Sequence, residues 1–307
     1  MLLAASLTLV AAMSPKLVVI SGCGSRGVGL GIARQVLARD EACQVVVMAR
    51  SHDRAASVAS ELGERAHAVA CDVTDDASCA SAAEAVKELG GSELLTLVNN
   101  AGYAADLPWF PPPWPAEAAA ATLAVNLYGA ERLTRHLLPM LQASADGRVV
   151  FVSSGGGRIN LKRMAEERRD ALLKTEALTW EAICEMATTF TAEYESAAAA
   201  QAADDAPQLP FLSPSGFWLQ SYGFSKACLG AYCQVLSRAQ PALRCMTCSP
   251  GWVATEMSST YTGDAELRTI DEGGEMPAWL ACAARAELGD EAGFFMPDRS
   301  CVSWAAD

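Results

Sequence analysis

The stretch LVVISGCGSRGVG, residues 17–29, decides the fold class of this chain. An apolar run over 17–20 indicates a short buried strand, and helical spacing follows over 28–39. The turn between them fits the pattern GxGxxG, in which glycine lets backbone amides approach a pyrophosphate and the helix N-terminus adds partial positive charge. We therefore predict a strand–turn–helix unit that binds a dinucleotide. Its candidate contact residues are Gly22, Gly24, Ser25, Arg26, Gly27 and Val28.

Strand and helix patterns continue to alternate through the first half of the chain. Strand-like runs cover 45–48, 67–73, 94–98 and 149–152, and helical patterns cover 52–62, 78–89 and 116–141. Uninterrupted apolar strands between helices predict a parallel sheet that is covered on both faces. Right-handed crossovers then give an α/β, doubly wound parallel sheet, which is the Rossmann fold.

Residues 158–217 interrupt this alternation. The segment is rich in Ala, Glu and Arg, has helical spacing over 163–191, and loosens over 197–214, where several prolines occur. The alternation then resumes with a helix over 221–236, a strand over 243–247, a helix over 271–286 and a last strand over 293–296. We predict a single Rossmann-type domain over 16–307 with a helical insertion at about 158–217.

Composition excludes several classes of protein. The net charge is −13 and the sequence pI is near 4.7, so no nucleic-acid partner is expected, since that binding depends on clustered Lys and Arg. Three histidines without a GxSxG motif argue against a Ser-His-Asp hydrolase. Of the eleven cysteines, Cys245 and Cys248 form a lone CxxC, which we interpret as part of a core strand and not as a metal site.

The first 15 residues, MLLAASLTLVAAMSP, are apolar but too short to span a bilayer, and they lack the basic start of a secretory signal. No other segment resembles a membrane span. We predict an apolar extension over 1–15 and a cytoplasmic protein. The alternative is an organelle, if this extension is a targeting segment.

The end of the second predicted strand indicates which nucleotide is bound. An NAD site usually places Asp or Glu there to hold the ribose hydroxyls, whereas this chain has Ala49-Arg50-Ser51. A guanidinium suits a 2′-phosphate because it offers forked donors and a fixed charge. Arg26, inside the glycine turn, could reach the same phosphate. The sequence therefore predicts NADPH/NADP+ as the cofactor, although two solvated arginines would give the same pattern.

The hexapeptide SYGFSK, residues 221–226, carries a YxxxK pattern at the start of a predicted helix. A spacing of four residues puts Tyr222 and Lys226 on one helix face. A free Tyr has a pKa of roughly 10, and a neighbouring ammonium lowers that pKa because it favours the phenolate. The pattern predicts an acid–base pair, but a helix with one half-buried Tyr would show the same spacing.

Several motifs in one order resemble those of the short-chain dehydrogenase/reductases, and among them the monomeric NADPH-dependent carbonyl reductases. Besides the glycine turn and YxxxK, they are Asp72-Val73, Asn99-Asn100-Ala101-Gly102, Asn126-Leu127-Tyr128-Gly129, Val152-Ser153-Ser154, and the octapeptide from Pro250 to Met257. The resemblance covers nearly the whole chain from Lys16. Each motif alone is modest, and the joint match is specific.

The resemblance implies a role for each of four catalytic residues. Tyr222 would donate a proton to the oxygen of a substrate carbonyl, and Lys226 would lower the pKa of Tyr222 and hold the nicotinamide ribose. Ser154 would hydrogen-bond the substrate oxygen. Asn126 would hold a water that links Lys226 to solvent.

The other motifs imply contacts with the cofactor or the substrate. Asp72 would contact the adenine ring, residues 99–102 would shape the cofactor floor, and Thr255 would contact the nicotinamide amide or the diphosphate. Trp252 would line the substrate pocket, and a packed aromatic is the equal alternative. The cofactor residues implied outside the turn are Arg50, Asp72, Val73, Asn99, Ala101, Gly102, Tyr222, Lys226, Pro250, Gly251, Val253 and Thr255.

Two features depart from the family pattern. The family turn is TGxxxGxG, whereas here Ser21 precedes Gly22 and four residues separate Gly22 from Gly27. The separation of Ser154 from Tyr222 is also wider than in most members. Monomeric carbonyl reductases carry a helical insertion at this point, which blocks the surface that other members use to form tetramers. The resemblance therefore implies a monomer in which the insertion forms one wall of the substrate cleft.

The leading hypothesis is NADPH-dependent reduction of a ketone, aldehyde or quinone to an alcohol. One alternative is an alcohol or steroid dehydrogenase that uses the same residues in the oxidative direction. Another is a nucleotide-binding sensor without turnover, which would be expected to lack the Tyr or the Lys. The sequence does not specify the substrate beyond a small-molecule carbonyl compound.

Overall fold

The computed structural model describes residues 16–89, 95–110, 113–174, 176–202, 208–288 and 293–304. Eight strands form one sheet in the order β3-β2-β1-β4-β5-β6-β7-β8. The predicted extension over 1–15 lies outside the described residues. The strands are β1 (Lys16–Ile20), β2 (Cys43–Ala49), β3 (Ala66–Ala70), β4 (Leu95–Asn99), β5 (Arg148–Val152), β6 (Arg244–Cys248), β7 (Phe294–Phe295) and β8 (Cys301–Val302).

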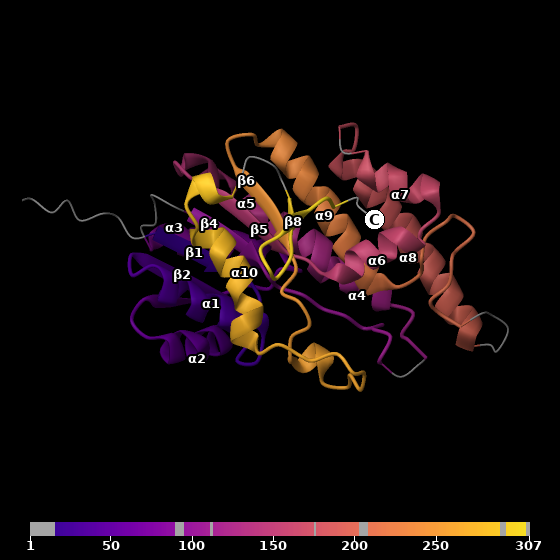
Figure 1. Ribbon diagram of the computed structural model, residues 1–307, viewed down its shortest axis with the longest axis horizontal. Coiled ribbons are helices and arrows are strands. Elements are labelled where there is room, and N and C mark those ends of the chain that lie inside the picture. The colour runs from indigo at the N-terminus through magenta and orange to yellow at the C-terminus, as the bar shows by residue number, and fades with distance from the viewer. Residues whose placement is uncertain are drawn as a thin grey trace, which may run out of the picture.

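Helices cover both faces of this sheet (Figure 1). Along β1, Leu17 and Val19 belong to one buried cluster, while Val18 and Ile20 belong to the other. Alternate side chains of a strand point to opposite faces, so two separate cores form. One core includes α3 (Asp76–Glu88), α5 (Ala130–Ala143) and α9 (Ser221–Ala239), and the other includes α1 (Val28–Arg39), α2 (His52–Leu62) and α10 (Ile270–Cys282). The predicted doubly wound fold is confirmed.

Three features of the structure differ from the prediction. The helix expected over 116–141 is divided into α4 (Ala118–Leu123), a π-helical segment η1 (Ala124–Gly129) and α5. The last sheet neighbour, β8, was not predicted, and it runs antiparallel to β7. With two residues and an exposed Cys301, β8 is too short to show an apolar pattern. Two short 3₁₀ turns, η2 (Glu256–Ser258) and η3 (Arg285–Glu287), follow β6 and α10.

The segment predicted as an insertion contains three helices instead of one, namely α6 (Gly155–Arg163), α7 (Glu166–Leu173) and α8 (Trp180–Ala202). The first begins directly after β5 because the Ser154 hydroxyl accepts the Gly156 amide at 3.1 Å and caps it. The last continues past residue 197, where loosening was expected, because a run of alanines favours helix. The predicted domain boundaries remain a prediction.

An aromatic cluster attaches these helices to α9. The rings of Phe190 in α8 and Phe224 in α9 stack with centroids 3.9 Å apart, and Phe217 meets both edge-on. All three side chains are fully buried. Such pairs add to the free energy of burial through their ring geometry. The insertion is therefore packed against the helix that carries Tyr222.

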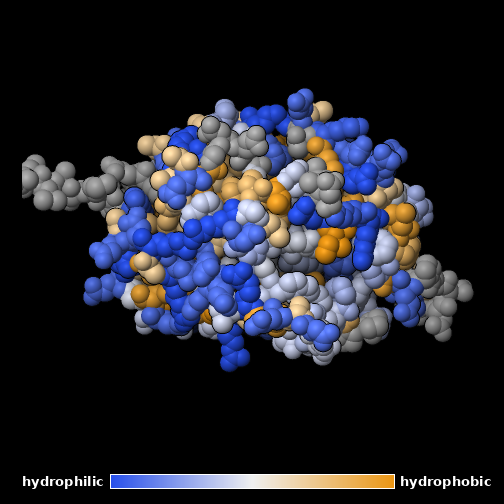
Figure 2. All heavy atoms as spheres, viewed as in Figure 1, coloured by the Kyte–Doolittle hydropathy of each residue, from blue (hydrophilic) through white to orange (hydrophobic). Residues whose placement is uncertain are grey.

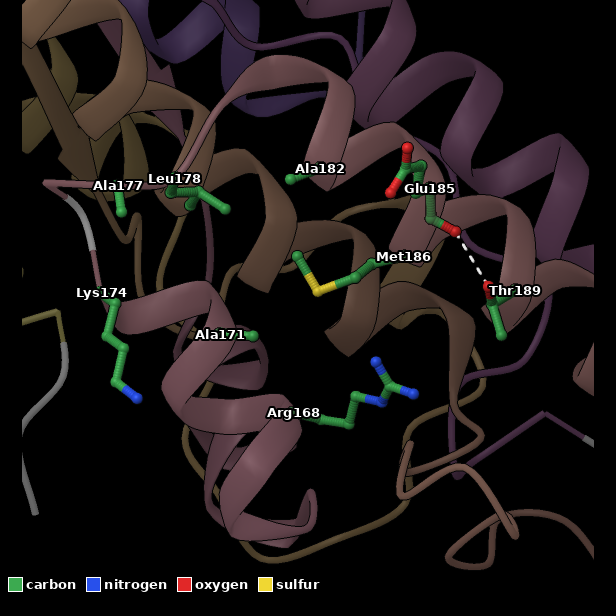
Figure 3. A pocket seen from close by; sticks show the side chains of 9 residues that line it. All are labelled: Arg168, Ala171, Lys174, Ala177, Leu178, Ala182, Glu185, Met186 and Thr189. Carbon is green, nitrogen blue, oxygen red and sulfur yellow. Dashed lines mark hydrogen bonds between the residues drawn. The ribbon is translucent and has the colours of Figure 1, made fainter.

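A groove of about 420 Å³ lies between α7 and α8. Its walls include Arg168, Lys174, Glu185 and Met186 (Figure 3). None of the four predicted catalytic residues lines this groove. It is a feature of the insertion and separate from the predicted chemistry.

Hydrophobic side chains on the face shown in Figure 2 lie in small groups among hydrophilic ones. Within the described residues, no helix combines the length and the hydropathy that crossing a membrane requires.

Candidate active site

Most of the predicted site residues follow the carboxyl ends of neighbouring strands, and residues 250–255 do so after β6. The glycine turn follows β1, Arg50 follows β2, and Asp72 lies two residues after β3. Residues 100–102 follow β4 and Ser154 follows β5. The strand order reverses between β1 and β4, and ligands of open α/β sheets bind outside the carboxyl ends at such a point. The topology therefore brings the predicted residues to one edge of the sheet.

The glycine turn is tightly packed at its first glycine and open at the next two. Gly22 has φ +70°, and a Cβ built there would lie 2.5 Å from the Cα of Ala101. A Cβ on Gly24 would meet nothing within 4 Å, and one on Gly27 only a carbonyl oxygen at 3.9 Å. The packed side of the turn therefore fixes its backbone, while the open side leaves room for a ligand.

Ser21 and Asn100 hold this turn against β4, a role that the sequence motifs did not predict for them. The hydroxyl of Ser21 accepts the amides of Asn100 and Ala101 at 3.1 and 3.0 Å. The Asn100 side chain donates to the carbonyls of Ser21 and Gly22 at 2.8 and 3.2 Å. Ser21 thus replaces the family threonine with the same hydroxyl chemistry. A polar residue directly before the first glycine was the available sequence signal.

The charged candidates for a 2′-phosphate lie at the surface. Arg26 and Arg50 are both exposed, and neither is hydrogen-bonded to the part of the chain that the structure describes. Hydrogen bonds from Thr74 lower the pKa of Asp72, and the charges of Arg50 and Arg132 lower it further. Arg50 and Asp72 are therefore near neighbours, as the ends of adjacent strands require.

Other predicted cofactor residues occupy different positions. Asn99 is buried, and its amide donates to the Thr134 hydroxyl in α5 at 2.9 Å. It can therefore shape the cofactor floor only by supporting the residues that cover it. Val73 is buried against Gly129 of η1. After β6, Pro250 is half-buried and Gly251 has φ +83°.

The same segment continues with Val253, which is buried against Gly273 of α10. Thr255 begins the 3₁₀ turn η2, and its amide donates to the Ser258 hydroxyl at 2.9 Å. Trp252, directly before Val253, is 46% exposed. Its ring packs 5.2 Å from that of Trp109 and 5.0 Å from that of Tyr261. Trp252 thus belongs to an aromatic cluster and keeps an exposed face as well.

Tyr222 and Lys226 lie in the first two turns of α9. Lys226 is 3% exposed, and its ammonium donates to the Val152 carbonyl at 2.8 Å, 5.7 Å from the centre of the Tyr222 ring. Burial lowers the pKa of Lys226 to about 8. The predicted face-sharing of the two residues is therefore seen.

Ser154 meets Tyr222 from the end of β5. Burial raises the pKa of the Tyr222 phenol, and a hydrogen bond with the Ser154 side chain lowers it part of the way. A Cβ on Gly156 would lie 3.4 Å from the Ser154 hydroxyl and 3.6 Å from the Tyr222 ring, so both groups lie beside the start of α6. The lowering of the Tyr222 pKa by Lys226 remains a prediction.

Asn126 lies within the π-helical segment η1, and π-helical turns occur often at functional sites. Its carbonyl oxygen accepts the Tyr103 amide at 2.8 Å, and its amide donates to the Tyr103 carbonyl and the Ser225 hydroxyl, both at 2.9 Å. The side chain therefore joins the segment after β4 to α9. No spare donor remains on it for a water.

The cysteines of the CxxC pattern, Cys245 and Cys248, are buried in β6, as predicted. Burial raises the pKa of both thiols.

Comparison with known proteins places the chain among similar sequences and structures. The family described as short chain dehydrogenase matches residues 16–166. Short-chain dehydrogenase/reductase 1 of Saponaria officinalis is 29% identical over 90% of this chain and 92% of its own. Carbonyl reductase (NADPH) 3 of Mus musculus is 28% identical over 84% of this chain and 87% of its own. The structure of salutaridine reductase from Papaver somniferum superposes with a TM-score of 0.74 at 26% identity, over 92% of this chain and 99% of that one.

Proposed function

The chain belongs to the short-chain dehydrogenase/reductase family, and from that premise we propose that it is an NADPH-dependent carbonyl reductase with Tyr222 as general acid. The observation that carries the proposal is that three side chains, those of Ser154, Tyr222 and Lys226, lie together beyond the carboxyl end of β5. The Ser154 hydroxyl lies beside Tyr222 and lowers the pKa of its phenol, and Lys226 is buried beneath the same ring. A phenol between a hydroxyl and an ammonium is suited to proton donation.

The residues present fit a nicotinamide dinucleotide. The open side of the turn at Gly24 and Gly27 leaves room for a pyrophosphate beside the N-terminus of α1. Arg50 and Arg26 would hold a 2′-phosphate, since both guanidinium groups are exposed near the end of β2 or in the turn. Asp72 and Val73 would border the adenine, and residues 99–102 and 250–255 would border the nicotinamide half. The bound cofactor supplies a hydride to the carbonyl carbon.

The chain's own residues then manage the proton. The Tyr222 hydroxyl gives its proton to the carbonyl oxygen, and the Ser154 hydroxyl hydrogen-bonds the same oxygen and holds it in place. With a pKa of about 8, Lys226 is mostly charged at neutral pH and stabilises the phenolate that remains. Because both hydrogens of the Asn126 amide are already engaged, a water that restores this proton would donate to a carbonyl oxygen of Asn126 instead of accepting from its amide.

A monomer is supported by what covers α9. In the resembling tetramers this region is an interface, whereas here α8 packs on α9 through Phe190 and Phe224. Tyr128 of η1 also meets Trp180 of α8 with centroids 6.0 Å apart. The insertion thus occupies a surface that a partner subunit would need. Light scattering should give the mass of one chain, and a stable tetramer would contradict this proposal.

The function is tested by following NADPH and NADH absorbance in parallel during a screen of ketones, aldehydes and quinones. We expect NADPH to be consumed with at least one of these classes, and NADH to be consumed much more slowly. Oxidation of alcohols by NADP+, without carbonyl reduction under any condition, would favour the reverse assignment. Nucleotide binding without turnover in either direction would favour the sensor.

A further inference from the structure

A buried carboxylate lies directly against the start of the catalytic helix. Asp106, in the segment after β4, is 0% exposed. Its carboxylate accepts the backbone amides of Ser221 and Tyr222, the latter at 3.2 Å. The Gln220 side chain donates to the Asp106 main-chain carbonyl at 3.2 Å and to its carboxylate at 3.4 Å. One side chain from a distant segment therefore binds the amide of the catalytic residue itself.

This contact satisfies a need that the local sequence leaves open. The first amides of a helix have no partner within the helix, and Ser, Thr, Asp or Asn at the N-cap usually supplies one. The N-cap of α9 is Gln220, whose side chain accepts only the Gly223 amide, at 2.7 Å. Asp106 takes the two preceding amides. A negative charge near the N-terminus of a helix also interacts favourably with the partial positive charge of the helix dipole there.

The same carboxylate connects three parts of the site. Its segment carries Tyr103, whose backbone is held by Asn126. Tyr194 of α8, in the insertion, lies near enough that burial raises the pKa of its phenol and the charge of Asp106 raises it further. Burial raises the pKa of Asp106, and the bonds from Ser221 and Tyr222 lower it. Buried charge is costly, so this carboxylate persists only with these partners.

We propose that Asp106 is the positioning residue of the reaction, which fixes the backbone of Tyr222 and thereby the place from which the phenol donates its proton. The proposal rests on the proposed function. Tyr222 is half-buried and held at its hydroxyl end by Ser154 and at its backbone end by Asp106. Losing the second anchor lets the first turn of α9 shift while the glycine turn and the arginines keep their places.

Asp106→Asn is the first test. The Asn side chain has one acceptor oxygen where the carboxylate has two, and its NH2 group would face the hydrogen of a backbone amide. One hydrogen bond to the start of α9 is therefore lost, while the volume of the side chain hardly changes. A misplacement of about 1 Å can cost about 100-fold in rate, so we expect kcat to fall about 10- to 100-fold. NADPH affinity, measured by fluorescence titration, and the thermal midpoint should stay close to those of the wild type. An unchanged kcat would overturn the proposal.

The matched control is Asp75→Asn. Asp75 caps α3 by accepting the Ala77 amide at 3.1 Å, and Asn is an equally good N-cap, so kcat should not change. A second variant approaches the contact from the helix. Ser221→Pro removes the Ser221 amide hydrogen at the first helical position, where Pro is tolerated, and should lower kcat in the same way. Ser221→Ala is its control, because it also removes the hydroxyl that donates to Thr122 at 3.2 Å but keeps the amide, so the further fall in kcat from Ser221→Ala to Ser221→Pro reports the amide contact.

The outcomes separate the two proposals. If wild-type protein reduces no carbonyl compound, the proposed function fails before any variant is compared. If wild-type protein is active and both contact variants bind NADPH with normal kcat, the positioning role fails alone. If both variants lose NADPH binding and cooperative unfolding together with activity, Asp106 is structural only, which also overturns it.

Discussion

The proposed catalytic residues and the proposed nucleotide-binding residues lie at the same edge of the sheet, where the strands end, but their side chains are held differently. On the catalytic side, Lys226 is bonded to Val152, and the Asn126 amide is bonded to Tyr103 and Ser225. On the nucleotide side, Arg26 and Arg50 extend into solvent. The proposed catalytic side chains are thus fixed by contacts within the protein, whereas the two arginines proposed to bind the 2′-phosphate are exposed.

This difference separates rate from affinity. Groups that are already oriented lower the barrier without reorganisation during the reaction, so their loss should appear in kcat. Groups that become ordered on binding pay an entropy cost at that moment, so their loss should appear in Kd. The following variants sharpen or break that separation, in order of expected effect.

Tyr222→Phe should have the largest effect, on the catalytic side. Removing the phenol proton takes away general acid catalysis, which contributes typically about 100- to 10,000-fold. We expect carbonyl reduction to fall by that factor, measured by NADPH absorbance, with NADPH affinity unchanged. Tyr232→Phe removes a hydroxyl from the same helix, where the ring packs on Phe151, and should remain active. Full activity of Tyr222→Phe would refute the assigned acid.

Gly22→Ala tests the one place where the nucleotide side is packed as tightly as the catalytic side. A residue with a side chain is strained at φ +70°, and its Cβ would meet backbone atoms of Ala101. We expect the free energy of unfolding to fall by about 2–4 kcal/mol, from left-handed strain and overpacking together. Chemical denaturation measures it. Gly24→Ala is the control, since its Cβ meets open space; equal losses in both variants would contradict the difference between the two glycines.

Lys226 links the catalytic side to pH. Its folded pKa is about 8, below the ordinary 10.5, so both states are charged below pH 8 and the full burial penalty of about 3 kcal/mol is present there. Between about pH 8 and 10.5 the unfolded chain binds more protons at this site, so its contribution to stability rises with pH. Between about pH 8 and 10.5, the free energy of unfolding of the wild type should therefore rise by about 3 kcal/mol relative to that of Lys226→Met. Denaturation of the ligand-free proteins measures this difference. Lys87→Met, at an exposed position, should show no such trend, and a flat difference for Lys226→Met would contradict the lowered pKa.

Local pattern predicted much of this molecule. The bounds of α1 and α2 follow from helical spacing alone, and the buried strands follow from their apolar runs. Tyr222 and Lys226 are four residues apart in one helix, so the motif alone predicts that their side chains lie on the same helix face. Long-range contacts are different, because nothing near Asp106 in the sequence indicates that it binds amides 115 and 116 residues away.

The misses share that cause. No local sequence pattern predicts the π-helical segment η1. Its Asn126 is held by the backbone of Tyr103, which lies in another segment. The same holds for Ser21 and Asn100, whose contacts join β1 to β4. Gly29 was not a candidate, yet its Cβ would lie 2.8 Å from the Asn100 amide nitrogen. The motifs therefore predict which groups react, and the structure shows the contacts that hold those groups.

Arg50→Asp tests the open side and should have the smallest effect of the four. A guanidinium bonded to a phosphate contributes about 1.5–3 kcal/mol, which corresponds to about 10- to 100-fold in affinity. NADPH binding should weaken by that factor, and NADH binding should change little or improve, because a carboxylate can accept the ribose hydroxyls. Fluorescence titration with both nucleotides measures the ratio. Arg39→Asp makes the same change of charge at the far end of α1, about 16 Å along the helix from Val28, so it isolates position from net charge. If Arg50→Asp and Arg39→Asp weaken NADPH equally, only the overall field is acting, and the exposed arginine at the end of β2 does not choose the cofactor.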